Sequence, residues 1–198
     1  MKPATKIVLV AIGAGLAGVA ASLWMSGPGP LLRSEAGQRA LQAVVAANAP
    51  PTPEDLPVAR KGEVIPHLRL TSLTGNLVEL PAAYAGRPIL INFWASWCGP
   101  CIQEMPELDR YAKTQGPNGT QVVGIALDDP EAVRAFLRRT PVGYPILLDT
   151  AGPRDSGVQL GNPKGVLPYS VLVSADGRLL KQRIGPFTHG EIEGWSAL

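Results

Sequence analysis

Hydrophobic positions divide the chain into an uncharged apolar run, a proline-rich stretch and, from about Val64, a long periodic part. In the periodic part, strand-type segments alternate with helix-type segments, and a hairpin closes the series, which predicts an α/β layered domain. Asp128 or Asp129 as a cap and Pro130 in the first turn mark the start of one helix. Strands are expected at 67–73, 76–80, 88–94, 121–127, 169–174 and 178–184, a short apolar segment at 144–148, and helices at about 98–114, 130–139 and 190–198.

The apolar run covers residues 7–25 and follows two basic residues, Lys2 and Lys6. A run of about 20 apolar residues is long enough to cross a bilayer as a helix, so residues 1–25 are predicted to be a signal anchor with a transmembrane helix. A cleaved signal peptide is the main alternative, although Trp24 continues the run beyond the usual length, and a buried core helix is the third. With the anchor uncleaved, the lysines stay in the cytoplasm and the C-terminal domain faces the periplasm or the cell exterior; cleavage would leave a secreted form.

Residues 26–62 are rich in proline and alanine, with an Ala-rich piece at 34–47 that is suited to a short helix. Proline-dense chains are extended and semi-rigid. We therefore expect a periplasmic tether that holds a folded domain, residues 63–198, away from the inner membrane.

Charge is sparse and almost balanced, with 18 basic against 16 acidic side chains and 45% hydrophobic residues in 198. Residues 1–60 carry five basic and three acidic side chains, and residues 61–198 carry 13 of each. A folded part without net charge or a basic run argues against a nucleic-acid-binding surface.

The chain has two cysteines, Cys98 and Cys101, separated by Gly-Pro. A disulfide between them encloses only two residues and adds little stability, so a purely structural role is disfavoured. A zinc site needs about four ligands, and the two histidines, His67 and His189, have no finger-like spacing. A mononuclear copper site on the two thiolates stays open as an alternative.

A redox role has a direct physical basis at this motif. Cys98 is expected where a buried strand turns into a helix, and the unpaired N–H groups of that helix end favour a nucleophilic thiolate. Cys101, one turn later, is placed to attack a mixed disulfide at Cys98. Pro100 is tolerated because first-turn N–H groups have no partner within the helix.

The segment 93–101, Phe-Trp-Ala-Ser-Trp-Cys-Gly-Pro-Cys, resembles the active site of the thioredoxin superfamily. The anchor, the N-terminal hairpin and Glu104-Met105-Pro106 make the chain similar to the TlpA/ResA-like branch, and the likeness covers roughly residues 64–190. It implies a thioredoxin-like fold, with a central mixed sheet flanked by helices, an N-terminal β-hairpin extension and a transmembrane helix before it.

The resemblance also implies a cis-proline that faces the disulfide, and Pro168 fits that position; an ordinary trans proline is the alternative. Leu167 before it is then placed to pair with a substrate chain. Trp97, Gly99, Pro100 and Leu167 are expected to form the substrate groove.

In the same branch, a glutamate at the position of Glu104 assists proton transfer near the disulfide. A partly buried carboxyl there has a raised pKa and suits a base toward Cys101, whereas a solvated helix surface is the alternative. Asn92 stands where cytosolic-type thioredoxins have a buried aspartate, so the proton-transfer role shifts to Glu104 or a bound water. Glu107, Asp109 and Arg110 are expected on a solvated face.

These features predict a membrane-anchored periplasmic thiol-disulfide oxidoreductase, most simply a reductant, that acts on disulfide-containing exported proteins. No dinucleotide fingerprint follows a strand, so no cofactor is expected and a membrane thiol donor must supply the electrons. The resemblance implies cytochrome c maturation or thiol supply for copper centres. The alternatives are an oxidant, a peroxiredoxin-like antioxidant protein, or a copper-binding chaperone that uses the cysteines with a histidine.

Overall fold

The computed structural model describes residues 44, 47–49 and 51–197. The predicted anchor at 7–25 and most of the tether lie outside them. Of the helix expected at 34–47, only 44 and 47 fall within the described residues, and both are helical, as is Asn48. No helix among the described residues is long and apolar enough to span a bilayer.

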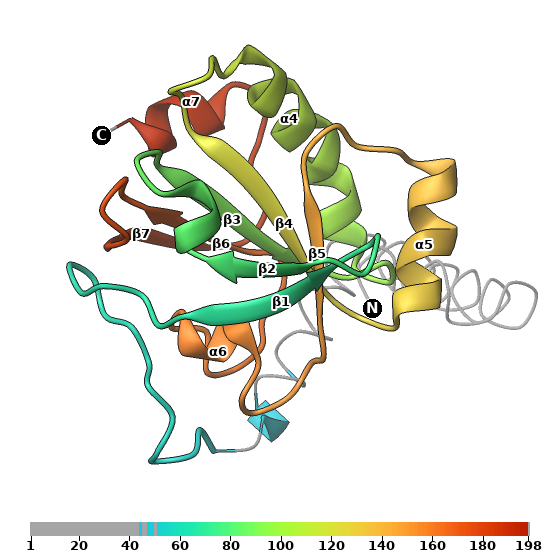
Figure 1. Ribbon diagram of the computed structural model, residues 1–198. Coiled ribbons are helices and arrows are strands. Elements are labelled where there is room, and N and C mark those ends of the chain that lie inside the picture. The colour runs from blue at the N-terminus through green and yellow to red at the C-terminus, as the bar shows by residue number, and fades with distance from the viewer. Residues whose placement is uncertain (1–43, 45–46, 50, 198) are drawn as a thin grey trace, which may run out of the picture. The chain divides into compact units, whose positions relative to one another are not determined.

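A mixed β-sheet forms the centre of the described domain (Figure 1), with strand order β2-β1-β5-β4-β3-β6-β7. The pairs β3–β4 and β4–β5 are parallel and the other neighbours are antiparallel. The expected mixed sheet and the N-terminal hairpin β1–β2 are therefore confirmed. The strands are β1 Leu68–Ser72, β2 Leu77–Leu80, β3 Ile89–Trp94, β4 Gln121–Leu127, β5 Ile146–Asp149, β6 Tyr169–Val173 and β7 Leu179–Ile184.

Helices cover both faces of this sheet (Figure 1). On one face, Glu104 of α4 bonds to Asn92 of β3, and Phe136 of α5 packs on Trp94 two residues along the same strand. Gly157 of α6 lies against the opposite face, beside Phe93. The helices are α4 Gly99–Thr114, α5 Pro130–Arg139, α6 Ser156–Gln159 and α7 Glu191–Ser196, with a 3₁₀ turn, η1, at Ala82–Tyr84.

The two central strands explain why the core forms here. Every residue of β3 is buried, as are all residues of β4 except Gln121. Such continuous apolar runs suit parallel strands that helices cover on both faces. Because β3 ends at Trp94 and α4 begins at Gly99, the four residues between them form the turn that carries the first cysteine.

The segment that leads into β1 is bonded to the far edge of the sheet. Val64 forms an antiparallel bridge with Arg178, and Gly62 N donates to Leu179 O at 2.7 Å. Ala59 N donates to Gln159 O of α6 at 2.8 Å. The chain before β1 thereby covers part of the exposed edge of β7, which limits pairing of that edge with other chains.

Candidate active site

Cys98 and Cys101 form a disulfide at the start of α4, with their Cα atoms 5.3 Å apart. Cys98 is the N-cap of this helix, and the backbone N–H of Cys101 donates to its Sγ at 3.3 Å. Pro100 lies in the first turn, as expected. Both cysteines are buried, with 1% and 0% exposure.

This placement gives the two sulfurs different chemistry. In the dithiol form, the helix end and the N–H of Cys101 favour negative charge on Cys98, which makes Cys98 the nucleophile. Cys101 lies inside the helix and is suited to resolve a mixed disulfide at Cys98. The arrangement supports thiol-disulfide exchange.

The peptide bond between Leu167 and Pro168 is cis, so the alternative of an ordinary trans proline is wrong. Pro168 immediately precedes β6, and Tyr169 of β6 pairs with Phe93 of β3. Because β3 leads directly into the active-site turn, the start of β6 lies at the same end of the sheet as this turn. Gly185 N donates to Pro168 O at 2.9 Å, which ties this loop to the end of β7.

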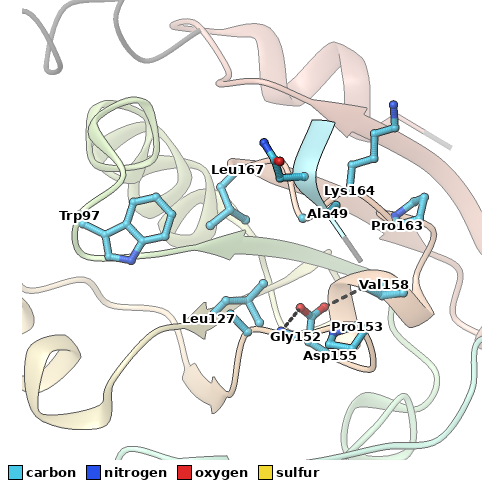
Figure 2. A pocket seen from close by; sticks show the side chains of 13 residues that line it. Ala49, Trp97, Leu127, Gly152, Pro153, Asp155, Val158, Pro163, Lys164 and Leu167 are labelled. Carbon is cyan, nitrogen blue, oxygen red and sulfur yellow. Dashed lines mark hydrogen bonds between the residues drawn. The ribbon is translucent and has the colours of Figure 1, made fainter. Parts of the chain in front are cut away.

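A pocket of about 440 Å³ has Trp97 and Leu167 among its lining residues, as Figure 2 shows. Gly99 and Pro100, which were expected in the same groove, do not line this pocket. The sequence did not indicate Leu127 or Val158 of α6 as lining residues. Leu127 was recognisable only as the last residue of a buried strand, and nothing in the sequence places the four-residue helix α6 at this pocket.

Glu104 is buried, so the alternative of a solvated helix surface is wrong. Its Oε1 accepts from Asn92 Nδ2 at 2.7 Å and its Oε2 accepts from the backbone N–H of Phe187 at 2.9 Å. Burial raises the pKa of Glu104 to about 7, although these two hydrogen bonds and the charge of Arg183 act in the opposite direction. A carboxyl with this pKa can accept and return a proton near neutral pH.

Asn92 extends this buried network. Its Nδ2 also donates to Ser170 Oγ at 3.0 Å, whereas its buried Oδ1 has no hydrogen-bond partner within the described protein. Because an amide does not titrate, Glu104 is the residue of this network that can change charge. Ser170 and Phe187 were not found from the sequence, since only the tertiary fold brings them to Glu104 and Asn92.

The expectation of a solvated face at Glu107 is wrong. Glu107 is 8% exposed and accepts from Arg110, from His189 and from the backbone N–H of Gly190. Hydrogen bonds from Arg110 lower the pKa of Glu107 to about 2, because they favour its charged form. Asp109 is also largely covered by the protein, and it accepts from Gly143 N at 2.6 Å. These two acidic side chains of α4 therefore bind backbone N–H groups of distant segments, Gly190 and Gly143.

The histidines do not complete a metal site with the cysteines in the described part of the chain. His189 is bound to Glu107, and His67 is exposed on the chain before β1. The described residues contain no group of three or more His, Cys, Asp or Glu side chains arranged to hold a metal ion. The described residues therefore give no support to the form of the copper alternative that adds a histidine to the two cysteines.

Comparisons with known proteins agree with this chemistry. The family model described as Redoxin matches residues 60–195. The chain is similar to the thiol-disulfide oxidoreductase ResA of Bacillus cereus, with 30% identity over 135 residues, which cover 68% of this chain and 75% of the relative.

Two solved structures are similar in fold and sequence. A thioredoxin-related protein from Neisseria meningitidis serogroup B is 31% identical with a TM-score of 0.55, over 63% of this chain and 93% of that one. A thiol-disulfide oxidoreductase from Bacteroides fragilis is 26% identical with a TM-score of 0.57, over 67% of this chain and 96% of that one.

Proposed function

This chain belongs to the redoxin family. We propose that its Cys98–Cys101 pair acts as a protein-disulfide reductase. The observation that carries the proposal is the position of Cys98 as the cap of α4, with the N–H of Cys101 directed at its sulfur. ResA, to which the chain is similar, is named a thiol-disulfide oxidoreductase, which supports the same dithiol chemistry.

Each turnover moves two electrons and two protons to the substrate. The Cys98 thiolate attacks one sulfur of the substrate disulfide, and the other substrate sulfur leaves and takes up a proton. Glu104 then accepts the proton of the Cys101 thiol, and the Cys101 thiolate attacks the Cys98 sulfur. The second substrate sulfur is released and takes up this proton from Glu104, while Cys98 and Cys101 are left as a disulfide.

The cis-proline loop and the pocket supply the proposed binding surface. Leu167 and Trp97 line the same pocket, so we place the substrate chain along these two residues, next to the sulfur of Cys98. In this arrangement the chain segment around the substrate cysteine lies against Leu167 and Pro168 in extended form.

We further propose that the domain works outside the cytoplasm, tethered to the inner membrane by residues 7–25 and facing the periplasm or the cell exterior. The support is the uncharged run of residues 7–25 after Lys2 and Lys6, followed by the proline-rich stretch. The substrates are then disulfide-containing exported proteins, and a membrane thiol donor re-reduces the pair. Cytochrome c maturation and thiol supply for copper centres are both consistent with this role.

The experiment is a comparison of full-length wild type with Cys98→Ser and Cys101→Ser in dithiothreitol-driven reduction of insulin. We expect Cys98→Ser to lose the catalysed rate, because the nucleophile is gone. Pre-reduced Cys101→Ser, mixed with insulin after dithiothreitol is removed, should accumulate as a mixed disulfide with the substrate, visible on a non-reducing gel. Wild-type activity in Cys98→Ser would overturn the mechanism.

A further inference from the structure

Asp128 holds the active-site turn from the end of β4. Its Oδ2 accepts from the backbone N–H of Ser96 at 2.8 Å and from Ser96 Oγ at 2.6 Å. Its Oδ1 accepts from the backbone N–H of Asp129 at 2.8 Å. Both oxygens are therefore occupied, and the carboxylate has a fixed orientation toward Ser96.

The turn that Asp128 holds determines where Trp97 lies. Cys98 N donates to Ala95 O at 3.1 Å, which places Ser96 and Trp97 at the two central positions of the turn. Trp97 is 58% exposed, so packing around the indole leaves more than half of its surface uncovered. The charge-assisted bonds from Ser96 to Asp128 hold the backbone from which the Trp97 side chain projects.

The end of β4, next to Asp128, also supplies part of the pocket. Leu127, the residue before Asp128, is 3% exposed and lines the pocket together with Trp97. Figure 2 shows Trp97 at one end of the pocket and Leu127 and Leu167 next to it. Movement of the turn relative to β4 would therefore change the distance between Trp97 and Leu127.

We propose that Asp128 is a positioning residue that, through Ser96, fixes Trp97 as one wall of a subsite for an apolar side chain next to the substrate cysteine. The inference rests on the proposed function and specifies its substrates as protein chains with an apolar residue beside the reducible disulfide. The pocket belongs to this interface because Trp97 adjoins Cys98 and Leu167 adjoins Pro168 in the sequence. A small disulfide without an apolar side chain does not use this wall.

The test separates substrate binding from thiol chemistry. Pre-reduced full-length protein is mixed with excess insulin or with hydroxyethyl disulfide, and single-turnover rates are recorded against substrate concentration. We expect Asp128→Ala to raise the half-saturating concentration of insulin about tenfold, the scale of one loosened apolar subsite, with its limiting rate unchanged. The rate with hydroxyethyl disulfide should stay at the wild-type value.

Two further variants make the result specific. Asp128→Asn keeps an acceptor oxygen for Ser96 and should restore most of the affinity for insulin. Asp129→Ala is the matched control, because Asp129 caps α5 through Glu131 N and Ala132 N and makes no bond to the turn, so insulin saturation should not change. If Asp128→Ala does not fold, Ser96→Ala, which loses the 2.6 Å bond, should shift insulin saturation in the same direction.

Two results would overturn the inference: unchanged insulin saturation in folded Asp128→Ala, or an equal loss with insulin and hydroxyethyl disulfide. The second result would indicate general damage to the cysteine pair. If the wild type reduces neither substrate, the proposed function itself fails, and that outcome is distinguishable from both.

Discussion

Asn92 donates a 2.7 Å hydrogen bond from Nδ2 to Oε1 of Glu104, and both side chains are fully covered by the fold. The amide stabilises the carboxylate without adding a second titratable group. Glu104 thus changes charge as a single buried acid, and its pKa of about 7 has consequences for both stability and rate.

The stability of the oxidised protein should fall as the pH rises from 5 to 8. The pKa of Glu104 is raised in the fold from 4.5 to about 7, so between these values the native state binds a proton that the unfolded chain has released. The contribution of protonated Glu104 to the unfolding free energy is complete below pH 4.5 and is lost as the pH passes 7. This contribution is at most about 3 kcal/mol. Urea unfolding at several pH values measures it.

Glu104→Gln is the control for this dependence, because it removes the titration and keeps an amide able to hydrogen-bond in the same site. Between pH 5 and 8, the difference in unfolding free energy between Glu104→Gln and wild type should change by as much as the wild-type value falls. A constant difference would show that Glu104 titrates at its ordinary value.

Resolution of the mixed disulfide should depend on the same group. In wild type, the rate at which Cys101 attacks should rise with pH through about 7, because ionised Glu104 accepts the thiol proton. Glu104→Gln should slow this step about a hundredfold, the scale of lost general-base catalysis, and remove the inflection near 7. Quenched-flow sampling of the mixed disulfide with insulin measures the rate.

The matched control is Glu131→Gln, an exposed glutamate of α5 that pairs only with Arg134 among the described residues. It should leave the pH profile of resolution unchanged. A wild-type profile in Glu104→Gln would assign the proton transfer to another group.

The sequence predicted the elements whose signals are local. β3 and β4 are continuous apolar runs, the motif at Cys98 marks a helix start, and Asp129 caps α5 as one of two expected candidates. The helix α6 was missed, because four residues are too few to show helical periodicity.

The environment of the carboxyls could not be predicted, because it depends on distant parts of the chain. Phe187, which bonds to Glu104, and Gly190, which bonds to Glu107, each lie 83 residues further along. On α4 alone, Glu104 and Glu107 are equivalent acidic residues one turn apart. Burial raises the pKa of Glu104, although the N–H of Phe187 acts against this shift, while hydrogen bonds from Arg110 lower the pKa of Glu107.

Glu107 should therefore matter for the attachment of α7. It accepts from Arg110 on its own helix and from Gly190 N at the start of α7. Glu107→Gln should reduce the unfolding free energy at pH 7 by about 2 kcal/mol, since a covered charged acceptor is lost while its donors remain. Glu131→Gln, on the surface, should change it by less than about 0.5 kcal/mol.

The pH dependence of the Glu107 contribution has the opposite sign to that of Glu104. Because the folded pKa of Glu107 is lowered from 4.5 to about 2, its contribution is present above 4.5 and is lost as the pH falls through 2. The deficit of Glu107→Gln should shrink in acid. A deficit that is constant down to pH 2 would contradict the charged network.

The direction of electron flow follows from how strongly the protein stabilises the Cys98 thiolate. The end of α4 favours the Cys98 thiolate, but the intervening Gly99 and Pro100 carry no charge that would stabilise it further. A weakly stabilised thiolate makes the dithiol the less stable form and the pair a reductant. The couple should therefore stay oxidised in a glutathione buffer that reduces strongly oxidising pairs.

Replacing Gly99 with Arg would place a cation beside Cys98 and stabilise its thiolate. This should shift the reduction potential upward by roughly 30 mV, which corresponds to about a tenfold change in the equilibrium constant of the couple. Equilibration with glutathione, followed by alkylation, measures both values, and a wild-type couple more oxidising than glutathione would reverse the proposed direction.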